Sequence, residues 1–585
     1  MRNELSLIEH IKKSKDLKVN LFEKTIKIAI LGSFTLNGLK ETLKVKTFEI
    51  GVNCDVYLAG YNQYNQEILN PESDLYKFKP DITFLIIDSR TILGDLFYYP
   101  YSVSEEERKE IIKNSSNELN NLLQKFIEKS NSKLIVTNLF IPIYSPYGIS
   151  ESNEKYGLKE MVYDFNKKLS MNCLDQLSIN VYDFNAFIAK YGESNVFNYN
   201  KFLLGDIKID FEFIPHLAHD LMSYVKANLG KIRKCIVLDL DNTLWGGIVG
   251  EDGFNGIKLG KTSPDNAYVE FQKHLLSLQQ RGIILAINSK NNWDDAIEVI
   301  NKHPDMVLRE RNFASIKINW NDKISNIKEI SKELNIGLDS MVFFDDDQAN
   351  REYMKKLLPE VLTIDLPKDP AQYSLTLMNL NDFSVFNITD EDKNRGEMYL
   401  QQKGRIELKN TAEDFEEYLN LLKSKIFMQK ANEFNIKRIS QLTLKTNQFN
   451  LTTKRYQENE IEKIMQEKNT IVGCARIEDK FGDNGITGCY IVKKKNLNEW
   501  ELDTFLLSCR VMGRKIEDAM MSYIINEVKK YGGSKLIGKF TPTKKNIPAK
   551  NFLIEFGFNN ENDQLEFKVD KKTNISVQLT IKEED

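Results

Sequence analysis

Paired cysteines are absent from this chain of 585 residues. Its six cysteines are scattered without a CxxC pair: Cys54, Cys173, Cys235, Cys474, Cys489 and Cys509. A disulfide framework or a cysteine-based zinc site needs regular, closely spaced cysteines, so neither is expected here. Each cysteine is therefore expected to be a reduced, mostly buried small hydrophobe unless its surroundings argue for another role.

Long apolar runs and an excess of one charge are also missing. No uninterrupted apolar stretch approaches the roughly 20 residues of a membrane-spanning helix, and the N-terminal segment MRNELSLIEHIKKSKDLKVN lacks the apolar core of a signal peptide. The 80 Lys and Arg nearly balance the 84 Asp and Glu, for a net charge of -4, so no global positive field gathers nucleic acid. We expect a cytoplasmic protein with no nucleic-acid or membrane partner.

What the chain has is length and apolar material for several cores. Its length is about four times the ~150 residues that serve as a soft prior for one domain, and 41% of it is hydrophobic. In residues 1–230, apolar runs (TIKIAILG, DITFLIID, SKLIVTNLF) alternate with helical stretches, and residues 231–370 repeat this alternation with KCIVLDLDNTL, GIILAINS and SMVFFDDD. Such alternation is typical of parallel sheets covered by helices, so we predict a multidomain α/β protein.

The rest of the chain has a different pattern. Residues 371–430 are polar with helical patterning and are predicted to form a helical connector. Residues 431–585 combine the strand-like runs TIVGCARIED, GITGCYIVKK and ELDTFLLS with the helical segment IEDAMMSYIINEVKKY, which predicts an α+β domain.

Carboxylates follow the first strand of the second domain. Asp239 and Asp241 come directly after the apolar run Ile236–Leu238, and buried carboxylates are costly unless a metal or hydrogen bonds compensate them. The ends of later strands carry further polar residues, namely Ser289, Lys290, Lys323, Asp345, Asp346 and Asp347. Open α/β sheets place ligands at this edge, so these residues are expected to form one site.

In order and context, these segments resemble the four motifs of the haloacid dehalogenase superfamily of phosphohydrolases and phosphotransferases. The resemblance implies that Asp239 is the nucleophile and Asp241 the general acid/base, with Mg²⁺ as the cofactor. It implies metal ligands at Asp239, Asp241 (through its backbone carbonyl), Asp345 and Asp346. It also implies phosphate-binding or orienting roles for Thr243, Ser289, Lys290 and Lys323.

Two longer segments of the sequence resemble a smaller family within this superfamily. The segments DLDNTLWGGIVGEDG and INWNDKISNIKEISKELNIGLDSMVFFDDD resemble the FkbH-like family, apart from Asp347-Gln348, where that family tends toward Asn-Pro. Such proteins take a glyceryl unit from 1,3-bisphosphoglycerate, remove phosphate, and pass the acyl group to the phosphopantetheine thiol of an acyl carrier protein. A small phosphorylated three-carbon substrate and a carrier protein are therefore the expected partners. The alternatives are a plain Mg²⁺-dependent phosphatase of a small metabolite and a non-catalytic carrier-binding scaffold.

In the last domain, the stretch LLSCRVMGRKIE leads from a strand into a helix. It resembles the GNAT-like acyltransferase fold, which implies acyl or pantetheine binding by Arg510, Gly513 and Arg514. Cys509 lies beside an arginine and close to a helix start, where the pKa of a thiol falls, so it is the candidate for an enzyme thioester. Residues 431–585 contain no histidine to pair with it, while Cys474 and Cys489 are expected in the core.

The first domain resembles the SGNH class of esterases in part. Ser33 follows the first strand and Asn138 a later one, but neither His216 nor His219 follows an Asp at the offset of three residues that this class uses. We predict an SGNH-like fold without hydrolytic activity. The lysines Lys493, Lys494, Lys495, Lys544, Lys545 and Lys550 are either solvated or a docking surface for an acidic carrier protein.

Overall fold

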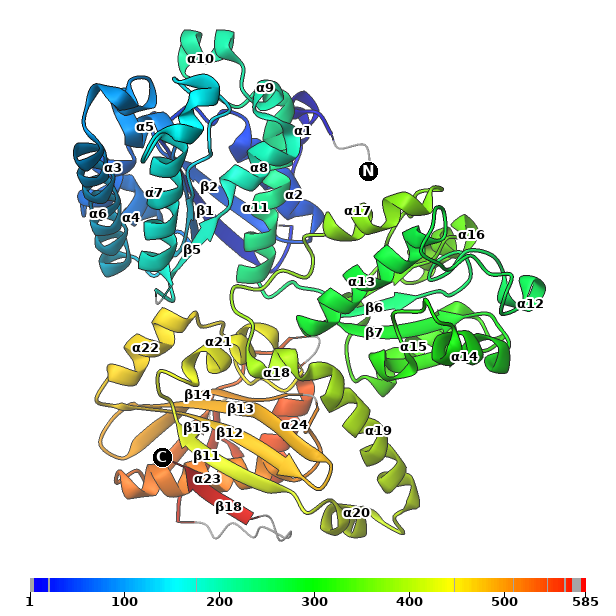
Figure 1. Ribbon diagram of the computed structural model, residues 1–585. Coiled ribbons are helices and arrows are strands. Elements are labelled where there is room, and N and C mark those ends of the chain that lie inside the picture. Colours follow the sequence, from blue (N-terminus) through cyan, green and yellow to red (C-terminus); the bar gives the residue numbers. More distant parts are fainter. Residues whose placement is uncertain are drawn as a thin grey trace. The chain divides into compact units, whose positions relative to one another are not determined.

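The protein is described here by a computed structural model (Figure 1). The structure describes residues 5–18, 21–174, 176–446, 448–508, 510–543, 546–561, 564–570 and 580–584. The chain divides into two compact units, Met1–Leu229 and Gly230–Asp585. In the part of the chain described, no helix has the length and apolar character needed to cross a membrane.

The first unit is built on a five-stranded parallel sheet with the strand order β2-β1-β3-β4-β5. Its strands are β1 (Thr25–Gly32), β2 (Asn53–Leu58), β3 (Ile82–Ile86), β4 (Lys133–Thr137) and β5 (Ile179–Tyr182). Every residue of β3 and β4 is buried, as expected for strands covered on both faces. The order reverses between β1 and β3, which makes their carboxyl ends the switch point of this sheet.

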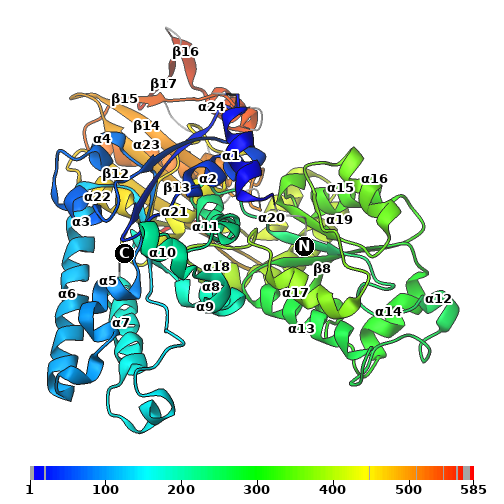
Figure 2. The ribbon, with the colours of Figure 1, turned by 90° about the horizontal axis from the view of Figure 1, so that it is seen from above.

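Helices cover this sheet. They are α1 (Leu7–Lys15), α2 (Leu39–Glu49), α3 (Tyr64–Leu69), α4 (Asp74–Phe78), α5 (Ser89–Leu93), α6 (Glu105–Lys129), α7 (Leu158–Cys173), α8 (Phe184–Tyr191), α9 (Glu193–Val196), α10 (Tyr199–Gly205) and α11 (Ile214–Asn228). The long helix α6 begins with a capping box between Ser104 and Glu107 and runs alongside α7 (Figure 2). The predicted α/β class of this unit is confirmed; the finer SGNH-like assignment is not.

The second unit opens with another five-stranded parallel sheet, of order β10-β9-β6-β7-β8. Its strands are β6 (Cys235–Leu238), β7 (Ile284–Ser289), β8 (Phe313–Ile318), β9 (Met341–Phe344) and β10 (Leu362–Thr363). Because the chain enters at β6 and later returns to pair β9 on its other side, the switch point lies between the ends of β6 and β9. These are the ends that Asp239 and Asp345 follow.

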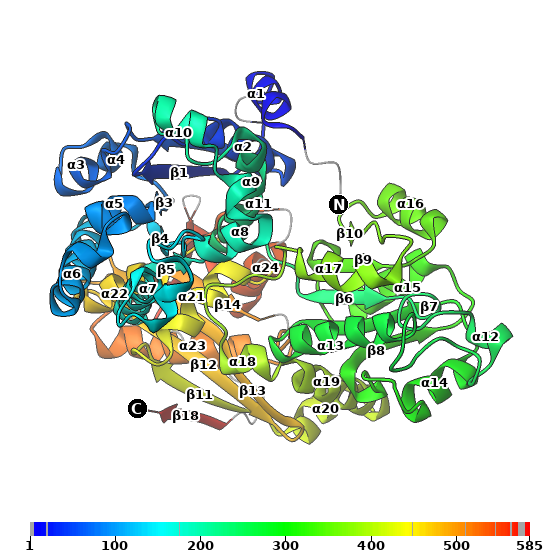
Figure 3. The ribbon, with the colours of Figure 1, turned by 45° about the horizontal axis from the view of Figure 1, so that its top comes forward.

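Two apolar cores enclose this sheet. Alternate residues of β6 face opposite sides: Ile236 and Leu238 belong to one core, and Cys235 and Val237 to the other. The helices are α12 (Val249–Asp252), α13 (Asn266–Gln280), α14 (Trp293–Lys302), α15 (Lys323–Glu333), α16 (Gln348–Leu357) and α17 (Tyr373–Met378). The first core takes residues of α13, α14 and α17 and the second those of α15 and α16; α13 and α17 lie side by side (Figure 3).

The second unit ends in a mixed sheet of eight strands, of order β16-β17-β15-β14-β13-β12-β11-β18. Its strands are β11 (Lys425–Lys430), β12 (Thr470–Asp479), β13 (Gly482–Lys494), β14 (Glu499–Leu507), β15 (Lys535–Gly538), β16 (Asn559–Glu561), β17 (Gln564–Lys568) and β18 (Thr580–Glu584). Its helices are α21 (Ile436–Lys445), α22 (Glu458–Gln466), α23 (Ile516–Lys530) and α24 (Ile547–Phe556). Apolar residues of α23 and α24 share one core with the sheet, which gives this region the predicted α+β character.

The polar connector is helical for most of its length, with α18 (Asp390–Lys393), α19 (Arg395–Thr411) and α20 (Phe415–Leu422). Its last predicted residues differ. Lys425–Lys430 form strand β11, which pairs with β12, because the buried run Ile426–Met428 adds an apolar strand to the sheet. The sheet therefore begins inside the segment predicted to be the connector.

Candidate active site

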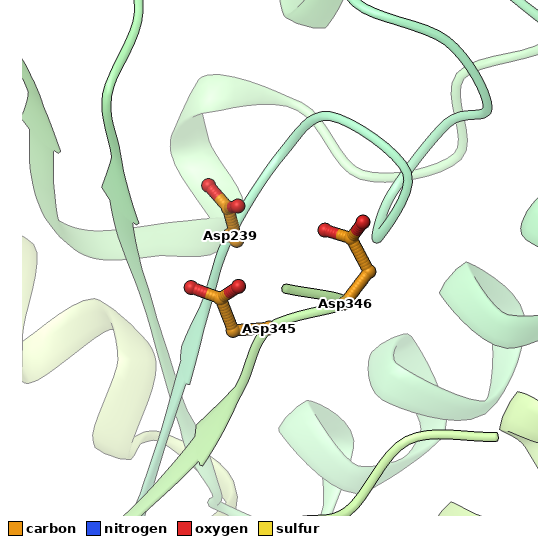
Figure 4. A group of neighbouring side chains, drawn as sticks. All are labelled: Asp239, Asp345 and Asp346. Carbon is orange, nitrogen blue, oxygen red and sulfur yellow. The ribbon is translucent and has the colours of Figure 1, made fainter. Parts of the chain in front are cut away.

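Three carboxylates meet at the switch point between β6 and β9. Asp239 follows β6, and Asp345 and Asp346 lie on the loop that leaves β9 (Figure 4). One oxygen of each lies within 4.8 Å of the others. Asp345 is fully buried and Asp239 is 8% exposed. So tight a group of anions repels itself unless cations or hydrogen bonds compensate it.

Lys323, at the start of α15, supplies one positive charge. Its Nζ lies 2.9 Å from Asp239 Oδ2 and 2.6 Å from Asp345 Oδ2, and the residue is 5% exposed. Burial opposes the charged form of Lys323, but the two carboxylates outweigh burial and raise its pKa. Three carboxylates and one ammonium leave two negative charges, which is the charge that a divalent cation neutralises.

Asp345 and Asp346 are held in place by α16. The backbone N–H of Asp347 donates to Asp345 Oδ1 at 2.9 Å, and Asn350 Nδ2 donates to the same carboxylate at 3.3 Å. Arg351 Nη1 donates to the backbone carbonyls of both aspartates. Burial, with repulsion from Asp239 and Asp345, raises the pKa of Asp346 to about 6.

Asp241 lies apart from the carboxylate group and is fixed by three donors. Trp245 Nε1 at 2.9 Å and the Val249 N–H at 3.1 Å donate to its Oδ1, and Asn291 Nδ2 donates to its Oδ2 at 2.9 Å. Burial nevertheless raises the pKa of Asp241. The site thus holds two neighbouring carboxyl groups in different environments, one beside a lysine and one in a cage of neutral donors, which is the arrangement that separates a nucleophile from a proton donor.

Among the residues that the structure describes, two buried oxygens in the site have no hydrogen-bond partner. They are Asp239 Oδ1 and Thr243 Oγ1, and Thr243 is fully buried. Buried polar atoms are almost always satisfied, so unpaired oxygens beside three carboxylates indicate a bound group. Hard oxygen ligands and a surplus of two negative charges fit Mg²⁺, and a free hydroxyl fits a phosphoryl oxygen.

The other predicted phosphate-binding residues lie at the same edge of the sheet. Ser289 ends β7 and is 1% exposed, whereas the side chain of Lys290 is exposed to solvent. Within the described ranges, Lys290 makes no ion pair with the carboxylates, so its phosphate-binding role stays a prediction. Asp347, the departure from the family pattern, caps α16 by accepting from the Ala349 N–H at 2.9 Å.

Sequence reasoning missed the residues that hold the site. Asn291, Asn350 and Arg351 contact the aspartates directly, but nothing in their spacing marks them. The one available signal for Asn291 was its place two residues after Ser289, on the loop that follows β7.

The predicted acyl-binding residues lie on the loop between β14 and α23. Gly513 has a φ of +70° and its N–H donates to Glu517 Oε1 at 3.1 Å. Arg514 is 4% exposed and pairs with Asp479 at 3.2 Å. Cys509 lies outside the described residues. Cys474 and Cys489 are fully buried, which confirms that they belong to the core.

In the first unit, Ser33 is 2% exposed and its Oγ accepts from the Asp88 N–H at 2.9 Å. Asn138 follows β4 and joins Asp183 and Asn185 at the start of α8. His216 lies on α11, with its ring against Tyr191.

The fold and the carboxylate group define a phosphatase-type α/β domain within a multidomain enzyme. Residues 231–365 match the Acid Phosphatase family model, and residues 27–226 match the model of the FkbH N-terminal domain. The resemblance to FkbH-like proteins predicted from the sequence is thereby confirmed. No curated protein matches the chain.

A solved structure supports the phosphatase-type assignment. The N-terminal part of the protein BF1531 from Bacteroides fragilis, which contains a phosphatase domain and is complexed with Mg, is 28% identical. The match covers 65% of this chain and 99% of that one, with a TM-score of 0.60.

Weaker likenesses are to acetyltransferases. A variant of the SpeG spermidine N-acetyltransferase from Vibrio cholerae is 13% identical, with a TM-score of 0.21 over 26% of this chain and 98% of that one. A GNAT family acetyltransferase from Elizabethkingia anophelis with acetyl-CoA bound is 14% identical, with a TM-score of 0.15 over 18% and 80%. Likenesses at these scores support no functional conclusion.

Proposed function

We propose that this protein is a Mg²⁺-dependent phosphatase and acyltransferase of the FkbH type. In this proposal it takes a glyceryl unit from 1,3-bisphosphoglycerate, removes phosphate, and loads the glyceryl group onto the phosphopantetheine thiol of an acyl carrier protein. The observation that carries the phosphoryl part is the unpartnered Asp239 Oδ1 beside Asp345 and Asp346. The glyceryl part is supported by the match to the FkbH N-terminal domain.

Asp239, Asp345 and Asp346 would hold Mg²⁺ together with the backbone carbonyl of Asp241. Three carboxylates from one sheet edge are the hard oxygen donors that this ion prefers. The Mg in the similar structure from Bacteroides fragilis supports the same choice of ion. When bound, the ion reduces the repulsion between the attacking carboxylate and the anionic phosphoryl group.

Asp239 is the proposed nucleophile. Lys323 fixes its Oδ2 and leaves Oδ1 without a hydrogen bond, so Oδ1 is the oxygen available for attack. The Oδ1–P bond forms, the bond from phosphorus to the leaving oxygen breaks, and an aspartyl phosphate results. The Thr243 hydroxyl and Lys323 would bind phosphoryl oxygens during this step.

Asp241 is the proposed general acid and base. Its raised pKa enlarges the protonated fraction near neutral pH, and that proton goes to the leaving oxygen. As a carboxylate, Asp241 then takes a proton from the water that attacks phosphorus. The P–Oδ1 bond breaks, phosphate is released, and the free carboxylate of Asp239 is regenerated.

The acyl step is proposed for the last domain. The Cys509 thiolate attacks the carboxyl carbon of an acyl phosphate, the carbon–oxygen bond to phosphate breaks, and a thioester forms. The carrier thiolate then attacks the thioester and Cys509 leaves as the thiolate. We assign to Arg510, Gly513 and Arg514 the binding of the acyl or pantetheine group in a GNAT-like fold.

The first unit completes the proposal as an SGNH-like domain without esterase activity. Ser33 is almost fully buried, and its oxygen already accepts a backbone hydrogen bond. Both facts disfavour an accessible nucleophile. The charge balance and the missing membrane-spanning pattern support the predicted cytoplasmic location, and the acidic carrier protein remains a proposed partner of the C-terminal lysines.

Intact-mass measurement tests the proposal. The purified chain is incubated with 1,3-bisphosphoglycerate, Mg²⁺ and a phosphopantetheinylated carrier protein. We expect release of phosphate and a glyceryl adduct on the carrier. Phosphate release without an adduct on any carrier protein would contradict glyceryl transfer and leave the plain phosphatase of a small metabolite.

Two variants separate the steps. Asp239→Asn should abolish the phosphatase turnover and leave at most the one phosphate per adduct that the acyl step releases, and an unchanged rate of phosphate release would favour the non-catalytic scaffold. Cys509→Ala should abolish the adduct and the phosphate released with it, whereas the plain phosphatase predicts full activity. Cys474→Ala is the matched control, since this cysteine is fully buried in the same domain and has no proposed role.

A further inference from the structure

Four arginines gather around the loop between β14 and α23. They are Arg405 on α19, Arg438 on α21, and Arg510 and Arg514 on the loop itself. Arg405, Arg438 and Arg514 are between 1% and 6% exposed. Burying a charge without a partner costs several kcal/mol, so such a cluster is informative about what lies between its members.

Two of the four share one carboxylate. Asp479 accepts from Arg405 Nε at 2.8 Å and Nη2 at 2.9 Å, in the two-pronged geometry that arginine and carboxylate prefer. Arg514 Nη1 donates to the same Asp479 Oδ2 at 3.2 Å. The single carboxylate of Asp479 is therefore shared by two guanidinium groups.

The other two arginines, Arg438 and Arg510, have a single distant carboxylate between them. Arg438 Nε donates to the Ile486 carbonyl at 3.0 Å and Nη1 to the amide oxygen of Gln441, while the nearest ion-pair partner, Glu391 Oε1, is 3.9 Å away. The guanidinium of Arg510 contacts the Ser508 hydroxyl at 3.5 Å and the Met398 thioether. Over the described ranges, no carboxylate pairs with Arg510.

Two carboxylates of α23 lie near this loop, but within the described ranges neither makes an ion pair with the four arginines. Asp518 lies 3.8 Å from Lys515, and Glu517 Oε1 accepts from the Gly513 N–H while its Oε2 has no hydrogen-bond partner there. The cluster thus sets four guanidinium groups against Asp479 and Glu391, a surplus of two positive charges. Burial and repulsion from Arg510 lower the pKa of Arg438 to about 10, in keeping with this surplus.

A buried hydroxyl lies next to these arginines. Thr487 is fully buried, and its Oγ1 has no hydrogen-bond partner in the described part of the chain. It is the extra residue of a β-bulge, because Ile486 pairs with Arg476 and Gly488 with the adjacent Ala475. The preceding carbonyl, of Ile486, binds Arg438, and the carbonyl of Thr487 accepts from the Ser508 N–H at 2.7 Å. Bulges re-aim side chains next to sites, and these two hydrogen bonds place the backbone of the bulge between Arg438 and the loop.

We propose that Arg438, Thr487, Ser508 and Arg510 bind a phosphomonoester, at a site separate from the carboxylates of the phosphatase-type domain. The surplus of two positive charges, one from Arg438 and Arg510 and one from the neighbouring Arg405 and Arg514, matches the charge of -1.5 to -2 that such a group carries near neutral pH. A carboxylate or a phosphodiester carries one charge and would leave a buried cation unpaired. The fork of Arg510 and the Thr487 hydroxyl supply donors for phosphoryl oxygens.

The ligand is the phosphorylated three-carbon acyl donor, and this identification alone rests on the proposed function. Held by its phosphate, the donor would present its acyl carbon to the loop that contains Ser508 and Arg510. Phosphopantetheine, a phosphodiester in carrier proteins, would bind weakly at this site by the same charge argument.

Calorimetric titration of the full chain with 3-phosphoglycerate, in the presence of a chelator, tests the site. Arg510→Gln should weaken binding about tenfold or more, and Thr487→Val, which keeps the shape of the side chain, about threefold to tenfold. Arg510→Lys should fall in between, because it keeps the charge and loses the fork. Arg476→Gln is the matched control, since Arg476 pairs with Glu478 and Asp483 in the same sheet.

Asp239→Asn distinguishes the two phosphate sites and should leave the measured affinity unchanged. Glycerate and a phosphodiester such as dimethyl phosphate should compete poorly, and inorganic phosphate should compete well. Binding that survives both Arg510→Gln and Thr487→Val, or that Asp239→Asn removes, would overturn the proposal. Intact binding together with no glyceryl adduct would instead leave this site standing and contradict the proposed function.

Discussion

Lys323 is the residue on which the charge balance of the carboxylate group depends. It bridges Asp239 and Asp345 at 2.9 and 2.6 Å from a position where all three side chains are buried. Its own carbonyl accepts from Asn288 Nδ2 at 2.9 Å, so the end of β7 also fixes the start of α15. The ammonium group therefore stabilises the metal-free site and positions the nucleophile.

Replacing Lys323 by Met should lower the free energy of unfolding by about 3–5 kcal/mol in a chelator, because two buried carboxylates lose their cation. Mg²⁺ should restore part of this loss, since it supplies positive charge to the same oxygens. Urea denaturation with and without Mg²⁺ measures both effects. Lys290→Met is the control, as Lys290 is an exposed lysine of the same domain; equal losses in the two variants would show that the ion pairs contribute nothing.

Asn291 is the positioning residue for Asp241. Its Nδ2 donates to Asp241 Oδ2 at 2.9 Å, and its Oδ1 accepts from the Asn292 N–H. Asn291→Ala should lower kcat for p-nitrophenyl phosphate about tenfold to a hundredfold, because a misplaced proton donor loses reactive geometry. The apparent affinity for Mg²⁺ should stay the same, as Asn291 does not touch the three-carboxylate group.

The neighbouring Asn292→Ala provides the comparison. Asn292 is close in sequence but bonds to Trp320 and Asp295 instead of Asp241. Its kcat should stay within about twofold of the parent. If Asn291→Ala lowered both kcat and the affinity for Mg²⁺, Asn291 would have a structural role instead of a positioning role.

At the scale of elements, the segment between Asp241 and Lys258 forms a turn that positions a hydrogen-bond donor for Asp241. Asn242 has a φ of +53°, which its side chain tolerates, and its Oδ1 accepts from the Gly247 N–H at 2.8 Å. Gly247 has a φ of +90°, and a Cβ there would come within 2.4 Å of Asp252 Oδ2. This turn delivers the Val249 N–H to Asp241.

Gly247→Ala should therefore lower both stability and activity. We expect a loss of about 1–3 kcal/mol in the free energy of unfolding, from an unfavourable backbone conformation and the clash, and a lower kcat as Asp241 loses the Val249 donor. Thermal unfolding and phosphatase assays measure the two. Gly250→Ala, in α12 with no atom within 4 Å of the added Cβ, should change neither; similar effects in both variants would refute this role of the turn.

The strand ends could be predicted from the sequence, because an apolar run predicts a buried strand. The carboxylates that follow such a run indicate the edge of the sheet where a ligand binds. Asp239, Asp345 and Asp346 do meet there. The cage around Asp241 could not be predicted, since side-chain partners such as Asn291 depend on three-dimensional approach. Strand β11 was missed because its short apolar run lies in a polar context.

The buried arginines mark a second limit of sequence reasoning. Arginine is usually exposed, so composition gives no reason to bury Arg405 in the connector or Arg438 in the last domain. The β-bulge at Thr487 could not be predicted either, because the sequence GITGCYIV has the pattern of an ordinary strand. Only the fold brings these charges and the free hydroxyl together.

At the scale of the whole molecule, separate cores predict separate unfolding. Among the described residues, the first unit has its own apolar core, the phosphatase-type sheet has one on each face, and the last sheet has another. A ligand that binds one folded domain stabilises that domain by mass action, by about 2.7 kcal/mol at a hundred times its Kd. The response to Mg²⁺ should therefore be confined to one part of the chain.

Scanning calorimetry of the full chain should show more than one transition, of which Mg²⁺ raises a single Tm and a chelator lowers it again. Asp345→Asn should remove this shift, because Asp345 belongs to the carboxylate group. Asp347→Asn should keep the shift, since Asp347 lies outside that group and caps α16 instead. An equal shift of every transition would contradict a single metal site at the β6–β9 switch point, because binding confined to one domain has no means of stabilising independently unfolding cores.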